Sequence, residues 1–137
     1  MSTIEDFVDE PNEGQRRAPE RVQRKRTKGW RMPANTVYVG RGTEWGNPAR
    51  VEHCFGDEWL IAIGQGHYPH FDSEEEARHE AVRMYREYFI GARIDRDEHV
   101  ARIRRELAGK NLACWCALDQ PCHADVLLEL ANKETEK

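Results

Sequence analysis

The sequence has no apolar run long enough to cross a bilayer, and it does not begin with the basic and then apolar segments of a secretory signal. Aromatic residues make up only 9% of its 137 residues and the formal net charge is only −4, so composition gives no general drive toward membranes or nucleic acids. We therefore expect a cytoplasmic protein whose four cysteines stay reduced. A disulfide framework is not expected on that basis, and the cysteines need another explanation.

Charge is distributed unevenly near the N-terminus. Residues 1–15 carry five acidic and no basic side chains, whereas residues 16–31 carry eight basic side chains and one acidic side chain. We predict that residues 1–18 form a flexible acidic leader and residues 19–137 a single domain. The basic run Arg16–Arg31 could contact nucleic-acid phosphates, but it lacks a recognised groove-reading motif. The favoured alternative is that it pairs with the acidic leader or stays solvated.

Strand and helix patterns follow one another along the rest of the chain. Residues 36–39 are β-branched or aromatic, and residues 50–63 resemble a hairpin that turns at Gly56. Ser73, with Glu76 three residues later, is typical of a helix start, and a second helix is expected over 95–107. A short buried strand over 111–115 and a helix from Cys122 complete the order. It predicts an α/β fold: a single compact domain with a small mixed sheet, flanking helices and Rossmann-like layers.

Three of the four cysteines lie in one short segment, LACWCALDQPCHADVLLEL, which spans residues 112–130. Cys114 and Cys116 would share one face of the strand, because residues two apart point the same way. Cys122 and His123 open the next helix, and the five residues between are few enough to bring its start back over the strand end. We expect three sulfur atoms and one imidazole to converge there.

Two kinds of chemistry are consistent with this cluster, beside simple packing. Zn²⁺ accepts thiolates and imidazole, so a metal set of Cys114, Cys116, Cys122 and His123 is one hypothesis, although adjacent ligands strain the helix start. In the other hypothesis, the helix N-terminus favours a Cys122 thiolate that acts as a nucleophile. His123 would then serve as acid or base, and Asp125 would orient it or cap the helix.

A second motif, VGRGTEWGNP at residues 39–48, follows the first clear strand and matches neither the dinucleotide-binding nor the P-loop fingerprint. Arg41 has a fork of donors suited to phosphate, and Trp45 offers a flat face for stacking on a base. Asn47 can donate and accept hydrogen bonds, while Gly46 and Pro48 shape the turn. A structural turn around a core tryptophan is an equally good interpretation.

Both motifs share one cleft if strands 36–39 and 112–115 are parallel neighbours, because ligands of open α/β sheets bind beyond the carboxyl ends of the strands. The expected ligand-binding residues are Arg41, Trp45, Gly46, Asn47 and Cys116. The expected catalytic residues are Cys122, His123 and Asp125.

Four strings in order, RTKGWRMP, VYVGRGTEWGNP, GKNLACWC and CHADVLLELAN, resemble the domain-of-unknown-function 4326 family of small proteins common in bacteriophages and actinobacteria. The resemblance covers about residues 19–132. That family often has Arg-Pro-Thr where this chain has Arg41-Gly42-Thr43, and an aromatic residue where it has Ala49. The resemblance carries over no catalytic role, but a phage setting suggests nucleotide or nucleic-acid metabolism.

The sequence thus favours a domain that binds a nucleotide-like or otherwise phosphorylated small ligand, with hydrolysis as the expected reaction. The alternative is a zinc-stapled accessory protein that contacts nucleic acid through its basic segment. A packing core whose function lies in a partner surface is the third reading.

Overall fold

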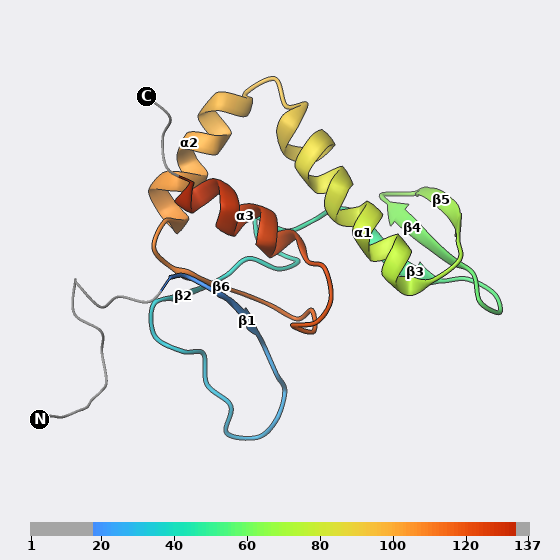
Figure 1. The fold of residues 1–137 in the computed structure, drawn as a ribbon, viewed down its shortest axis with the longest axis horizontal. Helices are drawn as coiled ribbons and strands as arrows, with labels where there is room; N and C mark the ends of the chain where they lie inside the picture. The colour runs from blue at the N-terminus through green and yellow to red at the C-terminus, as the bar shows by residue number, and fades with distance from the viewer. Residues whose placement is uncertain (1–17, 134–137) are drawn as a thin grey trace, which may run out of the picture.

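The computed structural model describes residues 18–133, and Figure 1 shows their arrangement. The leader expected over residues 1–18 lies outside this range apart from Ala18. The described residues form one mixed α/β domain with three α-helices, a parallel three-stranded sheet and a small antiparallel sheet. The expected fold class is confirmed, with the strands divided between two sheets.

The parallel sheet has the order β1 (Arg21–Gln23), β6 (Asn111–Cys114) and β2 (Thr36–Tyr38). In the register, Leu112 pairs with Arg21 on one side and with Val37 on the other. The central strand is the most buried because it is flanked by neighbours and covered by α3 (His123–Asn132). The expected parallel pairing of the two motif-bearing strands is confirmed, and the segments after β1, β2 and β6 all leave the same edge.

The antiparallel sheet has the order β3 (Arg50–His53), β4 (Trp59–Ile63) and β5 (Gly66–Phe71). The expected hairpin at Gly56 is confirmed, with φ of +54° at this glycine. The strand β5 was not expected, because the sequence GHYPHF has no β-branched residue and contains a proline.

Ser73 begins the helix α1 (Glu74–Met84), as the capping pattern predicts. Its side chain accepts a hydrogen bond from the Glu76 backbone nitrogen, while the Glu76 carboxylate accepts one from the backbone of Asp72. The helix continues as η2 (Tyr85–Gly91), which has wider π-helical turns. The helix α2 (Arg96–Leu107) follows and packs against α3.

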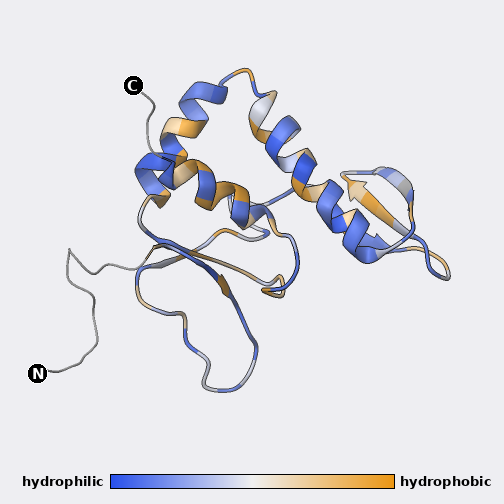
Figure 2. Cartoon of the chain, viewed as in Figure 1, coloured by the Kyte–Doolittle hydropathy of each residue, from blue (hydrophilic) through white to orange (hydrophobic). Residues whose placement is uncertain are grey.

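The helix α1 joins two apolar clusters, because its first turns lie against the antiparallel sheet and its far end leads toward α2 and α3 (Figure 1). One cluster lies between β6, α2 and α3, and the other between α1 and β4. Figure 2 shows apolar residues on β4 and α3 and mostly polar residues on α2. Among the described helices, none combines the length and hydrophobicity required to span a membrane.

Candidate functional site

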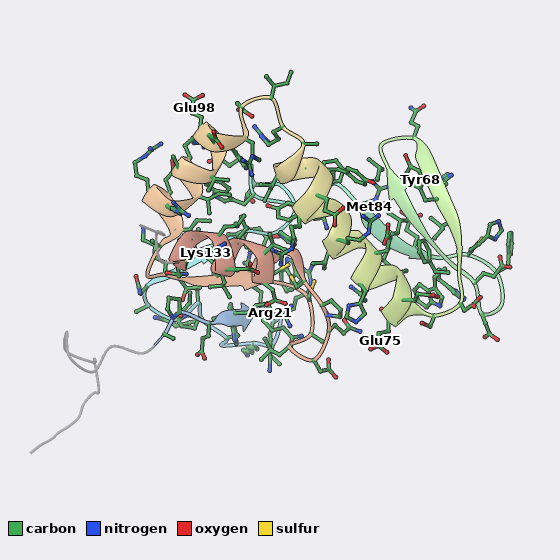
Figure 3. All side chains as sticks on the ribbon, turned by 45° about the horizontal axis from the view of Figure 1, so that its top comes forward. Arg21, Tyr68, Glu75, Met84, Glu98 and Lys133 are labelled. Atoms are coloured by element: carbon green, nitrogen blue, oxygen red, sulfur yellow. The ribbon has the colours of Figure 1, made fainter. Side chains whose placement is uncertain are left out.

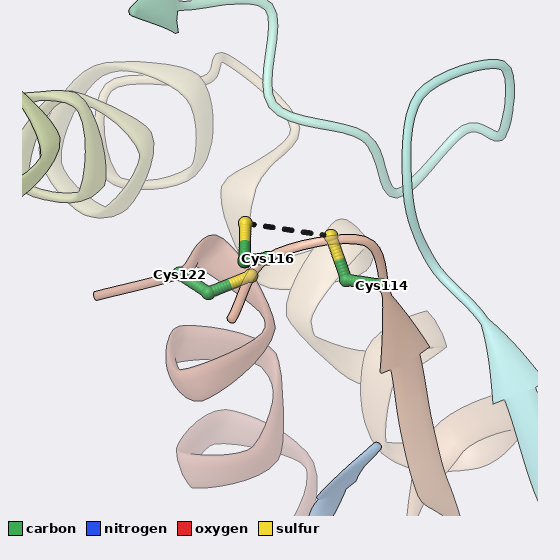
Figure 4. A group of neighbouring side chains, drawn as sticks. All are labelled: Cys114, Cys116 and Cys122. Carbon is green, nitrogen blue, oxygen red and sulfur yellow. Dashed lines mark hydrogen bonds between the residues drawn. The ribbon is translucent and has the colours of Figure 1, made fainter. Parts of the chain in front are cut away.

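Three cysteines form a thiol cluster at the edge where the parallel strands end. Cys114 is the last residue of β6, Cys116 lies in the following turn, and Cys122 is the N-cap of α3. The three sulfur atoms lie within 4.8 Å of one another, and those of Cys114 and Cys116 are 3.8 Å apart (Figure 4). Thiolates are soft ligands, so three sulfur atoms this close together can hold a soft metal ion.

The expected convergence of the three sulfur atoms is confirmed, but not by the expected route. The strand ends at Cys114, so Cys116 reaches the cluster from a turn instead of from the same strand face. Cys122 directly precedes the first helical residue, and its backbone has the extended conformation of an N-cap.

Arg21 holds the loop between the second and third cysteines. One nitrogen of its buried guanidinium donates hydrogen bonds to the carbonyl oxygens of Ala117, Leu118 and Gln120, at 3.2, 2.7 and 2.7 Å. Figure 3 shows this arginine near the loop that leads into α3. A permanent cation on β1 therefore fixes the loop that carries Cys122 to the cluster.

Asp125 contacts Arg21 instead of the imidazole that we expected it to orient. Its carboxylate lies 3.5 Å from the Arg21 guanidinium, and its side chain is 54% exposed. As the third residue of α3, it also lies where a negative charge favours the helix N-terminus. Of the two roles expected for Asp125, its place in the first turn of α3 agrees with the helix-end role, and a catalytic role stays a prediction.

His123 is buried beside the cluster. Its Nε2 lies 2.7 Å from the carbonyl oxygen of Val39, and its Nδ1 lies 3.7 Å from the Cys122 sulfur. A carbonyl can only accept, so Nε2 carries the proton and Nδ1 is left as an acceptor. The expected fourth metal ligand, His123, does not join the three sulfur atoms that lie within 4.8 Å of one another. Three of the four expected ligands therefore come together.

Negative charge is favoured on one sulfur of the cluster. Hydrogen bonds from the Cys114 and Cys116 thiols lower the pKa of Cys122, helped by the Ala124 backbone N–H and the charge of Arg21. Hydrogen bonds with Cys114 and Cys122, together with burial, raise the pKa of the Cys116 thiol. Cys122 is therefore the sulfur best suited to be a thiolate.

The thiol cluster lies on the wall of a pocket of about 420 Å³, a volume typical of small-ligand sites. We call it the thiol–arginine pocket. It is lined by four arginines and by no acidic residue among the described residues. The lining includes the arginines Arg26, Arg41, Arg50 and Arg78 and the aromatic residues Tyr38 and Trp115. It also includes the polar side chains of Asn47 and His123 and the three cysteines Cys114, Cys116 and Cys122.

The arginines of the pocket differ in their partners. Arg50 forms an ion pair with Glu52 at 3.2 Å, and Arg78 forms one with Glu74 at 2.6 Å. Arg26 and Arg41 form none within residues 18–133, and both are exposed. These two guanidinium groups are the best placed to meet an anion.

The aromatic walls of the pocket are Tyr38 and Trp115. The guanidinium of Arg24 lies 4.7 Å from the Tyr38 ring centre and 4.9 Å from that of Trp115, and Arg26 lies 4.4 Å from the Trp115 ring. Trp115 is 36% exposed. The sequence reasoning missed this pair, although an aromatic residue between two cysteines of the motif was a usable signal.

Trp45 does not line the pocket, in contrast to the expectation that it offers a stacking face there. It is only 5% exposed, and its ring lies 5.8 Å from that of His99 and 5.3 Å from the Arg102 guanidinium. Its carbonyl accepts a hydrogen bond from the Tyr85 hydroxyl at 2.7 Å. The alternative interpretation, a turn around a core tryptophan, describes its position.

Asn47 and Gly46 shape the turn beside the pocket. The Asn47 side chain donates to the Ala81 carbonyl and accepts from the Ala49 backbone, so it joins this turn to α1. A Cβ at Gly46 would meet the Gly40 carbonyl oxygen at 2.9 Å. Asn47 lines the pocket as expected, but both polar ends of its amide already have protein partners.

The turn at Gly42 has a φ of +96°, which proline cannot adopt. The backbone here therefore differs from any turn in which Arg-Pro-Thr replaces Arg41-Gly42-Thr43. Ala49 is buried on the pocket wall, so the absence of an aromatic side chain at this position leaves room in the pocket.

The basic segment expected to contact nucleic acid is divided in the structure. Arg16 and Arg17 lie outside the described residues, and Arg21 and Arg24 turn inward toward the loop and the aromatic walls. Arg26 is the member of this segment that lines the pocket. A nucleic-acid contact through Arg16–Arg31 stays a prediction.

Comparisons with known proteins place the chain in one family. A search of curated proteins found no match, and neither did a search of solved structures. The model of one family, described as a domain of unknown function (DUF4326), matches residues 22–133 and so covers all four motif strings in full. The resemblance noted from the motifs is therefore confirmed, and the chain belongs to the DUF4326 family.

Proposed function

We propose that the thiol–arginine pocket binds a small phosphorylated, nucleotide-like ligand. The observation that carries the proposal is a pocket with four arginines, two aromatic rings and no acidic residue among its described lining. An arginine fork matches the geometry of phosphate oxygens, and each charge-assisted hydrogen bond contributes about 1.5–3 kcal/mol. The phosphate would meet Arg26 and Arg41, because both are exposed and neither pairs with a carboxylate of residues 18–133.

The flat part of the ligand would lie against Trp115. This ring is partly exposed on the pocket wall, and the base would take the place of one of the two guanidinium groups, those of Arg24 and Arg26, that lie over the ring. Base stacking on an aromatic side chain contributes about 1–3 kcal/mol and tolerates different bases. Trp115 thus takes the role that the sequence suggested for Trp45.

Calorimetric titration with the four common nucleoside monophosphates tests this proposal. Arg41→Ala should weaken binding about tenfold or more, which corresponds to the loss of at least 1.4 kcal/mol. Arg105→Ala is the matched control, since Arg105 is exposed on α2 and does not line the pocket. The corresponding nucleosides should bind more weakly than the monophosphates. Equal affinities for wild type and Arg41→Ala would contradict the proposal.

Hydrolysis is the reaction that we propose for the bound ligand, with water as the second reactant. In one route the Cys122 sulfur attacks the ligand atom that carries the bond to be cleaved, and His123 Nδ1 takes the thiol proton across their 3.7 Å separation and passes it to the leaving group. Water then hydrolyses the covalent intermediate and frees Cys122. In the other, Cys114, Cys116 and Cys122 would hold a metal ion, which would supply an activated water. Chelation that stops turnover favours the metal route, whereas turnover that survives chelation but not Cys122→Ser favours the nucleophile.

A further inference from the structure

We infer that Cys114, Cys116 and Cys122 bind one zinc ion through three thiolates and leave its fourth coordination position open to the thiol–arginine pocket. Three protein ligands with one exchangeable position are the mark of a catalytic zinc site, whereas a structural site is closed by four. The ion binding does not depend on the proposed function. Only the identity of the natural ligand at the fourth position rests on it.

The positions of the sulfur atoms fit such an ion. Tetrahedral zinc with Zn–S bonds of about 2.3 Å places its sulfur ligands about 3.8 Å apart. The Cys114 and Cys116 sulfurs are 3.8 Å apart, and all three sulfurs lie within 4.8 Å of one another. The three sulfur atoms are therefore spaced nearly as three thiolates of one zinc ion would be (Figure 4).

The fourth position faces the pocket because all three cysteines line it. Cys114 and Cys122 are buried on their other sides by the apolar cluster of β6 and α3, whereas Cys116 is half-buried. Zinc with three thiolates carries a net charge of −1. The guanidinium groups of Arg26 and Arg41, which line the same pocket, offset this charge and favour an anionic fourth ligand.

His123 is the competitor for the fourth position. Its Nε2–H donates to the Val39 carbonyl, an arrangement also found when the other ring nitrogen binds a metal. Its Nδ1 nevertheless lies outside the compact group of sulfurs, and Tyr85 packs against its ring at 5.1 Å. In the open site, Nδ1 remains an acceptor beside the ion instead of becoming a ligand.

Metal analysis of the purified full-length chain tests the ligand set. Wild type should bind about one zinc per chain, and Cys122→Ser and Cys114→Ser should lose most of it. Cys54→Ser is the matched control, because Cys54 lies in the antiparallel sheet region and does not line the pocket. His123→Gln should keep the zinc. Loss of the metal in this variant, or no zinc in wild type, overturns the inference.

Cobalt-substituted wild-type protein tests the open position without any variant. Thiolate-to-cobalt absorption should appear, and azide, which needs only an exchangeable coordination position, should shift the visible bands. A cobalt spectrum that does not respond to azide means a closed site and overturns the inference. Nucleoside monophosphate should shift the same bands in wild type. A response to azide without a response to the nucleotide contradicts the proposed function and leaves the open metal site in place.

Discussion

The Nε2 atom of His123 lies 2.7 Å from the carbonyl oxygen of Val39, although the two residues are 84 positions apart in the chain. This bond joins the first residue of α3 to the residue after β2. It therefore holds the glycine-rich turn and the thiol-bearing turn at the same edge of the parallel sheet.

Replacing His123 with Phe should destabilise the fold, because the buried Val39 carbonyl loses its partner. The expected loss is about 1–3 kcal/mol in the free energy of unfolding, measured with urea in the presence of a chelator. His79→Ala is the control: this side chain is 66% exposed, and its removal should change stability by about 0.5 kcal/mol or less. Equal stability of the two variants would show that the bond is not needed.

Arg21 and Asp125 form an ion pair, but we expect the two partners to contribute very differently. Arg21→Ala removes three hydrogen bonds to loop carbonyls, and the free energy of unfolding should fall by about 2 kcal/mol or more. Asp125→Ala removes only a partly solvated carboxylate at 3.5 Å, and the fall should be less than about 1 kcal/mol. Similar losses in both variants would mean that the ion pair, and not the carbonyl contacts, holds the loop.

The two tryptophans should separate binding from stability. Trp115→Ala should weaken nucleoside monophosphate binding about fivefold or more, from the loss of about 1–3 kcal/mol of stacking, with little effect on the unfolding midpoint. Trp45→Ala should lower the free energy of unfolding by about 3–5 kcal/mol, because its ring is buried in the core. Calorimetric titration and thermal unfolding of both variants give the comparison, and unchanged affinity in Trp115→Ala contradicts the stacking role.

Stability should also fall in mild acid because of His99. Burial lowers its pKa below the ordinary value of 6.5, and the charges of Arg93 and Arg102 add to this effect against Asp95 and Glu44. The unfolded chain therefore takes up a proton before the folded chain does as the pH falls. The stabilising contribution is complete above pH 6.5 and is lost as the pH falls from there through the lower folded-state pKa.

His99→Leu should remove this component of the pH dependence. Urea unfolding at pH 7.5 and at pH 5.5 measures it: wild type and the control His79→Ala should lose stability between the two values, and His99→Leu should lose less. An unchanged difference in His99→Leu would assign the pH dependence to other groups.

The sequence predicted those parts of the fold that short-range patterns determine. The capping pattern at Ser73 and the hairpin at Gly56 were both confirmed. The parallel pairing of the motif-bearing strands, which is a long-range contact and was the condition for a shared cleft, is also present. It did not predict β5, because that strand is formed by pairing with β4 and not by its own composition. It also could not predict that the strands divide into two sheets, since this depends on long-range packing such as that of α1 against β3, β4 and β5.

For the site, the sequence predicted which segments meet but not which side chains face the pocket. Trp45 and Trp115 illustrate the difference: each follows a parallel strand, yet one ring turns into the core and the other lines the pocket. Arg50 and Arg78 were missed because they come from the antiparallel sheet and α1 and reach the pocket only through packing. Spacing along the chain carries no information about such contacts.

Crystallographic data at the zinc absorption edge, from the zinc-loaded chain with a bound nucleoside monophosphate, test the shared site most directly. The account predicts one anomalous peak among the sulfurs of Cys114, Cys116 and Cys122, and phosphate density between that peak and Arg41. Ligand density on another face of the molecule, or no anomalous peak at the sulfurs, would contradict it.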